Sequence, residues 1–517
     1  LEDTREVLPP ALPDYLISAA LIAVLVTSFF DLSSGGGDRH DTGGSGVIAE
    51  SSLAVLPLVD FSEGGVNQHL GNGIAEAVLN ALTNLDGLQV ASRTSSFAAQ
   101  LKDMDASQIG ERLGVGQILE GSIRRQGNKL RVSAQLTNVN TGFQVWSSTY
   151  DRQFEDIFDI EEELARSLVV ALKGPLALDD NPIVKSGTTN VEAYNLNLRG
   201  RYLFESPTQE NFIAATQAFQ RAIELDPDYG SAHGYLAFCL GYASIYSSFV
   251  QQVMPAAVSI ELALRHDPGN TPATMIKGFM MRSFDDQYIY YRQALDTDQD
   301  RDLTLYVYSN AYLTAQSRHE ELREALMAAL ETNPDSVLIL QALAEVESHS
   351  GNYELALDII SRAGALDGSN FLVSAVLVDV YYRSRDGKKL REAAEQSIAK
   401  IGKQNGFIYQ YLLQAHVLNG DLDSAEAILQ EMLDVRERGD TWSATTIGMS
   451  LASLGRIDEA AIWFVRAYRE RDYWLLWHLR SAIHDIPALG VDPTIRNLLE
   501  RMGLDDASIE RRIAEGR

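Results

Sequence analysis

The chain has 517 residues, of which 45% are hydrophobic and 22% charged, with 71 acidic and 43 basic residues and a formal net charge of -28. A chain of this length is too long for one hydrophobic core, so we expect at least two domains. The negative charge argues against binding to nucleic acid or anionic lipid, and a single cysteine, Cys239, excludes an internal disulfide framework. Because Cys239 lies among apolar and small residues, we expect a buried thiol rather than a nucleophile.

The first predicted element is an uncharged apolar run over residues 15–30, which Leu32 extends. It approaches the roughly 17–25 residues that cross a bilayer, and a glycine-rich stretch follows it. A signal-peptide core and a buried soluble helix are the alternatives, but acidic residues precede the run and no clear cleavage pattern follows it. We therefore expect a transmembrane anchor at residues 15–32 and a flexible linker at residues 33–50. Residues 1–14 are expected to be a truncated flank, because the chain begins with Leu1.

Strands and helices alternate over residues 51–174, which predicts a compact α/β domain. The strands are expected at residues 52–61, 88–94, 119–126, 129–136 and 142–152, and the helices at residues 73–85, 107–114 and 156–172. Acidic runs such as the one at Glu161 are expected to lie on the solvated faces of helices.

The most basic short stretch of the chain is residues 121–132, which could contact nucleic acid or form the solvated side of a hairpin. Gly127 and Asn128 suit a two-residue hairpin turn. This turn sets Arg124 opposite Arg131, and it gathers the apolar side chains on one strand face and the polar ones on the other. We interpret the basic residues as solvent-facing, with contact to a small anion near the two arginines as the alternative.

These segments, in this order and spacing, resemble the TolB amino-terminal-like domain of bacterial membrane signalling proteins. The resemblance implies an output module before the membrane helix, either a winged-helix DNA-binding domain or a nucleotide cyclase, and tetratricopeptide repeats after the α/β domain. It also implies a single-pass protein of the bacterial inner membrane, with the α/β and repeat domains in the periplasm. No such output module stands in these residues, so we expect neither transcriptional nor cyclase activity from this chain alone.

The second half of the chain repeats a pattern of small and apolar residues with a period near 34. The same spacing recurs in four triplets: Ala215, Phe219 and Ala222; Ala256, Ile260 and Ala263; Ala356, Ile360 and Ala363; and Ala460, Phe464 and Ala467. This period is typical of tetratricopeptide repeats, in which small residues let paired helices approach. We expect a linker at residues 175–190 and an all-α solenoid of about seven or eight repeats, with a C-terminal cap, at residues 191–517.

Catalytic motifs are not recognisable in the sequence. No Gly-Lys-Ser/Thr follows the first strand, and no pair of histidines has the spacing of a zinc protease. We expect no catalytic, cofactor-binding or metal-binding residues. Trp474 and Trp477 could cover the open end of the solenoid, with contact to a partner as the alternative.

We expect the function to lie in the concave face of the repeats, which the first helix of each repeat lines. The candidate partner-binding residues are Tyr235, Tyr242, Gln341, Glu345 and His416. The prediction is a non-enzymatic, membrane-tethered sensing module that binds a protein or peptide and, by itself, no nucleic acid. The alternative is the regulatory half of a nucleotide cyclase or of a winged-helix regulator.

Overall fold

The computed structural model describes most of the chain after residue 51. The described residues are 52–83, 85, 87–97, 101, 104–174, 183–204, 209–246, 253–297, 304–309, 318–332, 334–366, 371–401, 406–438, 442–470 and 472–515. They all belong to one compact unit, Ile48–Arg517. The predicted anchor at residues 15–32, its flank and the glycine-rich linker lie outside them. Within these ranges, no helix is both long and apolar enough to cross a membrane.

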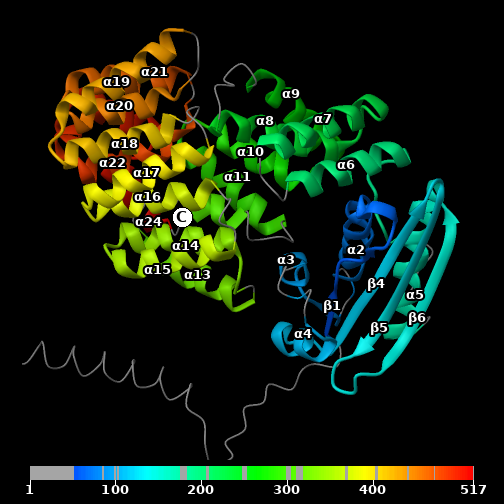
Figure 1. Ribbon diagram of the computed structural model, residues 1–517. Coiled ribbons are helices and arrows are strands. Elements are labelled where there is room, and N and C mark those ends of the chain that lie inside the picture. Colours follow the sequence, from blue (N-terminus) through cyan, green and yellow to red (C-terminus); the bar gives the residue numbers. More distant parts are fainter. Residues whose placement is uncertain are drawn as a thin grey trace, which may run out of the picture. The chain divides into compact units, whose positions relative to one another are not determined.

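A mixed sheet organises the α/β domain (Figure 1). Its strands are β1 (Ser52–Val55), β2 (Val59–Asp60), β3 (Gln89–Val90), β4 (Gln117–Gln126), β5 (Lys129–Asn138) and β6 (Gln144–Gln153). The order is β3-β1-β4-β5-β6, with β2 also paired to β4. β1 pairs in parallel with β3 and with β4, and β2 pairs in parallel with β4. The strands β4, β5 and β6 form an antiparallel meander. The single strand expected at residues 52–61 is divided into β1 and β2 around Pro57, which has no N–H to donate to a ladder.

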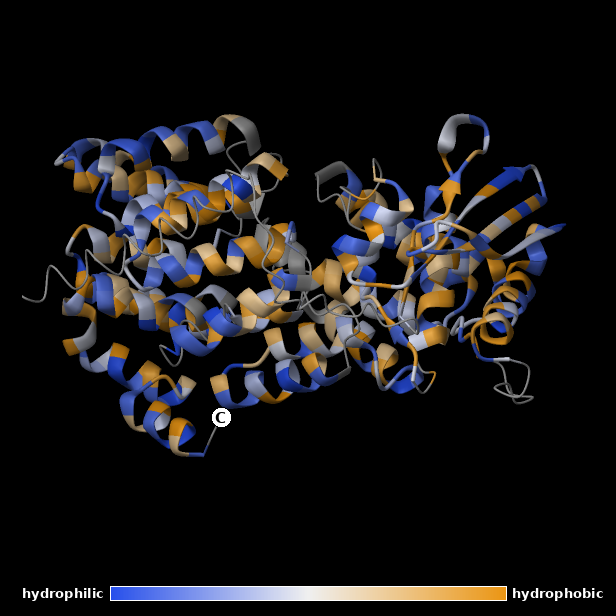
Figure 2. Ribbon diagram, turned by 90° about the horizontal axis from the view of Figure 1, so that it is seen from below, coloured by the Kyte–Doolittle hydropathy of each residue, from blue (hydrophilic) through white to orange (hydrophobic). Residues whose placement is uncertain are grey.

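Helices cover both faces of this sheet to different extents. α2 (Gln68–Thr83) and α5 (Ile157–Lys173) pack together against one face through fully buried residues such as Ile74 and Leu164. On the other face, α4 (Ala106–Leu113) buries Ile109 against Ala54 and Ile118, and α3 (Arg93–Ser96) lies beside β1. Apolar and polar residues alternate along the strands (Figure 2), so the sheet has a buried face and a largely solvated one.

The predicted hairpin is confirmed in every pairing. Gln126 pairs with Lys129 and Ile123 with Val132, around a turn in which Gly127 has a φ of 59°. Arg124 stands opposite Arg131, and the anion that relieves this like-charge pair is Asp151 of β6, which forms an ion pair with Arg131. The basic side chains are therefore solvent-facing, as expected. The lack of nucleic-acid binding stays a prediction.

The rest of the described chain is a stack of antiparallel helix pairs of the tetratricopeptide type. The pairs are α6 (Val191–Phe204) with α7 (Gln209–Leu225), α8 (Gly230–Tyr246) with α9 (Val253–His266), α10 (Thr271–Phe279) with α11 (Phe284–Thr297), α14 (Val337–His349) with α15 (Tyr353–Leu366), α16 (Phe371–Arg383) with α17 (Gly387–Ile401), α18 (Gly406–Leu418) with α19 (Leu422–Glu437), and α20 (Ala444–Ser453) with α21 (Ile457–Glu470). These are seven pairs with both helices among the described residues. α13 (His319–Thr332) is the second helix of another, in line with the predicted seven or eight.

The small residues that recur with the repeat spacing are buried between paired helices, as predicted. Ala222, Ala263, Ala363 and Ala467 are all fully buried at helix contacts. A glycine faces the aromatic ring of the partner helix in two repeats: a Cβ on Gly200 or on Gly448 would lie only 2.6 Å from the ring of Phe219 or Phe464. Helices can approach this closely because the side chains between them are so small. Cys239 is also buried, which raises the pKa of its thiol to about 12, as a packed core thiol requires.

The last helices form a cap that returns to the middle of the solenoid. They are α22 (Tyr473–Asp485), the short 3-10 helix η6 (Pro487–Val491), α23 (Pro493–Met502) and α24 (Asp506–Ala514). Arg512 of α24 is fully buried, with its guanidinium 4.6 Å above the ring of Phe284 and 3.5 Å from Asp285 at the start of α11. The cap therefore covers apolar surface that the stack of repeats would otherwise expose.

The α/β domain and the first repeat share one hydrophobic core. Tyr194, Leu198 and Tyr229 pack into the same cluster as the helices α2 and α5. Polar contacts accompany this packing, because Arg201 of α6 and Arg93 both pair with Glu76 of α2. Glu161 of α5, expected on a solvated helix face, is instead fully buried here.

Candidate interaction surfaces of the repeats

The structure places the five predicted partner-binding residues in different environments. Tyr235 is half-buried: its ring stacks on Phe219 with centroids 5.5 Å apart, and the guanidinium of Arg201 lies 5.1 Å from its centroid. Gln341 is fully buried, so the expectation that it faces solvent or a partner is wrong. It lies on the side of α14 that packs into the repeat core.

Two further candidates, His416 and Tyr242, provide little evidence for a binding surface. The Nδ1 of His416 lies 3.0 Å from Oδ2 of Asp421, which ties it to the turn between α18 and α19. Tyr242 belongs to α8, but its side chain lies outside the described residues. Glu345 alone of the five belongs to a polar cluster on the inner helices. The partner-binding role of the five residues stays a prediction.

This inner-face cluster comes from four helices. Its members are Glu345 and His349 of α14, Asp379 and Arg383 of α16, Tyr411 of α18, and Ser481 and Asp485 of α22. Within α14, α16 and α22 the two members are four residues apart, which places them on one side of the helix. The cluster therefore lines the side of the first helices that faces across the solenoid.

Arg383 is the centre of the cluster. Its Nε donates to Oδ2 of Asp379 over 2.9 Å, and its Nη2 donates to Oγ of Ser481 over 2.6 Å. Asp485 lies 3.4 Å from the same guanidinium, and the hydroxyl of Tyr411 donates to Asp379 over 2.8 Å. These bonds hold α22 against the inner side of α16, so the chain itself occupies this part of the concave face.

Aromatic rings extend the same contact to α18. Trp474 of α22 stacks on Phe407, with ring centroids 4.6 Å apart, and His478 lies 4.8 Å from the Trp474 ring. Trp474 therefore covers the inner side of α18. That Trp474 and Trp477 cover the open end of the solenoid stays a prediction. The side chain of Trp477 lies outside the described residues.

The protonation states follow from burial and from the charges around Arg383. Burial and the neighbouring charge of Asp379 raise the pKa of Glu345 to about 8, and burial also raises the pKa of Asp485. Burial, with the nearby cation Arg383, holds the pKa of His349 well below its ordinary value. At neutral pH Glu345 is thus a neutral carboxylic acid beside a neutral imidazole. The cluster contains three carboxyl groups and one guanidinium, and Glu345 is the carboxyl group that a further cation would help to ionise.

The sequence contains a signal for this cluster in addition to the spacing of the small residues. Asp379 and Arg383 stand 34 residues after Glu345 and His349, so they occupy the same positions one repeat later. Selecting these positions on successive first helices would have identified both pairs. The contribution of α22 had no such signal, because Asp485 reaches Arg383 from more than 100 residues away.

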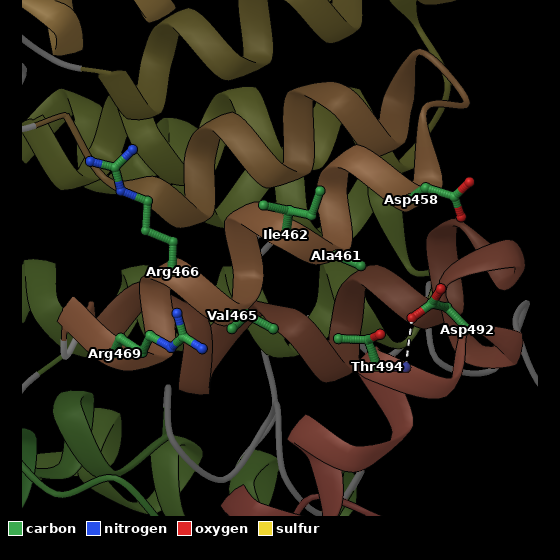
Figure 3. Close-up of a pocket in the computed structure, with 8 residues that line it drawn as sticks. All are labelled: Asp458, Ala461, Ile462, Val465, Arg466, Arg469, Asp492 and Thr494. Atoms are coloured by element: carbon green, nitrogen blue, oxygen red, sulfur yellow. Dashed lines mark hydrogen bonds between the residues drawn. The ribbon is translucent and has the colours of Figure 1, made fainter.

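A second surface is the groove between α21 and α23 (Figure 3). It has a volume of about 590 Å³ and is lined by Asp458, Ala461, Ile462, Val465, Arg466, Arg469, Asp492 and Thr494. Figure 3 shows its two acidic side chains at one end and its two arginines at the other, with the apolar residues between them. The α21–α23 groove is therefore apolar in the middle and oppositely charged at its ends.

Across the part of the chain that the structure describes, no three side chains of histidine, cysteine, aspartate or glutamate are arranged to hold a metal ion.

Comparison with known proteins gives a partial likeness. No family model matches the chain, so the resemblance to the TolB amino-terminal-like domain stays a prediction. The chain is 35% identical over 190 residues to a protein of Rhizobium meliloti (strain 1021) named "Putative adenylate cyclase 3". The match covers 37% of this chain and 32% of that protein, so the chain spans about a third of its relative.

Three solved structures with similar helical stacks illustrate the fold only. Human IFIT1, solved as a dimer with m7Gppp-AAAA, has a TM-score of 0.39 at 13% identity, covering 61% of this chain and 77% of that one. PilF of Pseudomonas aeruginosa has a TM-score of 0.28 at 19% identity, covering 40% and 93%. A tetratricopeptide repeat protein from Parabacteroides merdae ATCC 43184 has a TM-score of 0.30 at 12% identity, covering 60% and 99%. The chain thus has a likeness, over part of its length, to a relative named as an adenylate cyclase.

Proposed function

We propose that this chain is a non-catalytic protein-binding module, and that the inner face of its repeats holds a basic segment of a partner protein. The observation that carries the proposal is the position of Glu345, which lies on the inner face without a hydrogen-bond or ion-pair partner among the described residues. This carboxyl group is partly exposed on the inner face, yet burial and Asp379 raise its pKa to about 8.

The contacts of the inner-face cluster leave two groups available. Among the described residues, the carboxyl group of Glu345 and the ring nitrogens of His349 have no hydrogen-bond partner, whereas Asp379 and Arg383 are paired with each other. Since α22 covers the inner sides of α16 and α18, the partner would meet the remaining edge at α14. Helical repeats use such inner faces to bind extended or helical segments.

The charge balance selects the kind of segment. A lysine or arginine side chain brought beside Glu345 would supply the missing positive charge and favour the ionised carboxylate, so binding would release a proton. The formal net charge of -28 would also steer a basic segment towards the chain. We therefore propose a basic peptide segment as the bound class.

The test compares the same substitution, glutamate to glutamine, at two positions. Full chain carrying Glu345→Gln and full chain carrying Glu354→Gln, an exposed glutamate of α15, are titrated with a lysine-rich peptide and with a glutamate-rich peptide of equal length. We expect the lysine-rich peptide to bind the wild type and the Glu354 variant alike and to bind the Glu345 variant at least about tenfold more weakly. Equal binding to all three proteins, or stronger binding of the acidic peptide, contradicts the proposal.

Attachment to the bacterial inner membrane, with the repeats in the periplasm, belongs to the same proposal. Its support is the uncharged apolar run at residues 15–30 and the resemblance to membrane signalling proteins. Protease accessibility of a tag at the C-terminus, measured in intact and lysed spheroplasts, tests this placement. Cleavage only after lysis would contradict it.

A second candidate function is the regulatory half of a nucleotide cyclase. The name of the partial relative favours this candidate. Most of that relative's length lies outside the match, so a cyclase domain would lie in the part that this chain does not cover. The coding sequence upstream of Leu1 decides this: a cyclase domain supports the candidate, whereas a winged-helix domain or an initiating methionine directly before Leu1 contradicts it.

A further inference from the structure

The exposed side of α21 carries four residues that form a charge-reversed palindrome. Asp458, Ile462, Val465 and Arg469 follow one another at intervals of four, three and four, so they lie along one side of the helix. All four line the α21–α23 groove, and Figure 3 shows Asp458 and Arg469 at its opposite ends. Ile462 is 68% exposed and Val465 is partly exposed, so the middle of the groove presents apolar surface to solvent.

The two end charges differ from the other charges of α21. Glu459 forms an ion pair with Arg456, and Arg466 forms one with Glu470. Asp458 and Arg469 have no ion-pair or hydrogen-bond partner among the residues that the structure describes. They lie eleven positions apart on one helix, too far to reach each other.

A second copy of the same helix satisfies all four residues at once. If two α21 helices pack antiparallel about a two-fold axis that passes between Trp463 and Phe464, Asp458 of each copy faces Arg469 of the other. Ile462 of each copy then faces Val465 of the other. Because the axis relates the two surfaces, every contact occurs twice, as in an isologous dimer.

We propose that the α21–α23 groove is a self-association surface on which a second copy of this chain docks, with α21 antiparallel to α21. The two ion pairs set the direction of the helices, and the Ile462 and Val465 side chains supply the apolar centre. Asp492 lies at the acidic end of the groove with Asp458, so it adds to the field that meets the second copy's arginines. The proposal does not depend on the binding of a basic segment to the inner face.

The expected dimer is weak and reversible. Stable interfaces bury about 800 Å² on each partner, which is more than a single pair of short helices provides. Repulsion between two chains of net charge -28 also opposes association, although physiological salt screens it beyond about 8 Å. The close ion pairs across the groove are screened less. We therefore expect association that rises with concentration in the micromolar range.

The symmetry of the surface gives a charge-swap test. Sedimentation velocity of the full chain, in one detergent and over a range of concentrations, is compared for the wild type, Asp458→Arg, Arg469→Asp and the double variant carrying both. Each single change sets like charges opposite each other in both pairs and is expected to weaken dimerisation about tenfold or more. The double variant exchanges the charges, rebuilds both pairs and is expected to dimerise like the wild type.

Two further variants separate this surface from other causes. Asp423→Arg, on an exposed position of α19, makes the same charge change elsewhere and is expected to leave association unchanged. Ile462→Glu is expected to abolish it while thermal unfolding stays that of the wild type. A wild type that remains monomeric, a double variant that is not restored, or an Asp423 variant that behaves like Asp458→Arg overturns the proposal. A monomeric wild type that binds an unrelated helix at this groove overturns it too.

Discussion

The hydroxyl of Tyr194 donates a 2.9 Å hydrogen bond to Oε1 of Glu161, inside the core that α5 shares with the first repeat helix α6. Burial raises the pKa of Glu161, the bond from Tyr194 opposes this, and the charge of Glu76 adds to it, so that the pKa lies at about 8. Glu161 is therefore protonated at neutral pH. The α/β domain is joined to the repeats through a neutral buried pair.

Stability should depend on pH through Glu161. Between its ordinary pKa of 4.5 and about 8, the unfolded chain has released the proton while the folded chain retains it. Raising the pH in this window therefore favours unfolding, by up to about 1.4 kcal/mol per unit, and the contribution is fully present only below about pH 4.5. Glu161→Gln should remove this slope and exceed the wild type in free energy of unfolding at pH 8 more than at pH 5. Urea unfolding at pH 5 and pH 8 measures the free energy of unfolding of both proteins. An equal change between the two pH values in wild type and variant would contradict the prediction.

The hairpin should be sensitive on one face only. Ile123 is 1% exposed under α2 and α5, so Ile123→Asp puts a charge without a partner into the core and should lower the free energy of unfolding by several kcal/mol, about 3 or more. Arg124→Ser, on the exposed face, should change it by about 0.5 kcal/mol or less. Chemical denaturation measures both. Similar losses for the two variants would contradict the assignment of the faces.

The turn after α16 should become more stable with glycine. Arg385 has a φ of 59°, and its position corresponds to Gly351, Gly420 and Gly455, which have φ values of 83°, 77° and 77°. A left-handed conformation costs a residue with a Cβ about 1 kcal/mol. Arg385→Gly should therefore raise the free energy of unfolding by up to about 1 kcal/mol, and Gly351→Arg should lower it by about as much. Thermal melts compare the two variants. A lower melting temperature for Arg385→Gly would show that the contact of Arg385 with the Tyr382 ring outweighs the cost of the left-handed conformation.

The inner-face cluster should depend on its single guanidinium. Arg383→Met leaves Asp379 and Asp485 without their cation, and removing one partner of a buried ion pair costs about 3–5 kcal/mol. Arg383→Lys should lose less, because it keeps the charge but not the fork of donors. Hydrogen exchange of α22 reports the effect directly. Unchanged protection of α22 in Arg383→Met would show that the aromatic contact of Trp474 alone holds this helix.

Enlarging a small residue between paired helices should destabilise one repeat. Ala363 of α15 is fully buried, so Ala363→Leu should cost about 1–3 kcal/mol through overpacking. Glu354→Leu, on the exposed side of the same helix, is the control and should be close to neutral. Tyr235→Ala should also lower stability, because the Tyr235 ring packs on Phe219. Chemical unfolding of the three variants gives the order.

Local patterns in the sequence determined the hairpin and the repeats. The register of β4 and β5 follows from a two-residue turn and the alternation of side chains, since a slip of one residue would expose the apolar face. The repeat spacing follows from small residues that must recur wherever paired helices touch. The helical spacing of α5 also indicates that Glu161 is buried, because Glu161 shares a side of the helix with Ile157 and Leu164. Its charge had favoured a solvent-exposed position.

Contacts between distant segments were decided by the tertiary structure alone. Asp485 meets Arg383 because the stack of repeats brings α22 back to the inner side of α16, and no local pattern encodes that curvature. Glu345 likewise owes its raised pKa to burial and to Asp379, which the stacking of α14 on α16 brings near it, rather than to a neighbour in sequence. Side-chain spacing fixes which face a residue occupies, but whether that face meets solvent or another helix depends on where the rest of the chain packs.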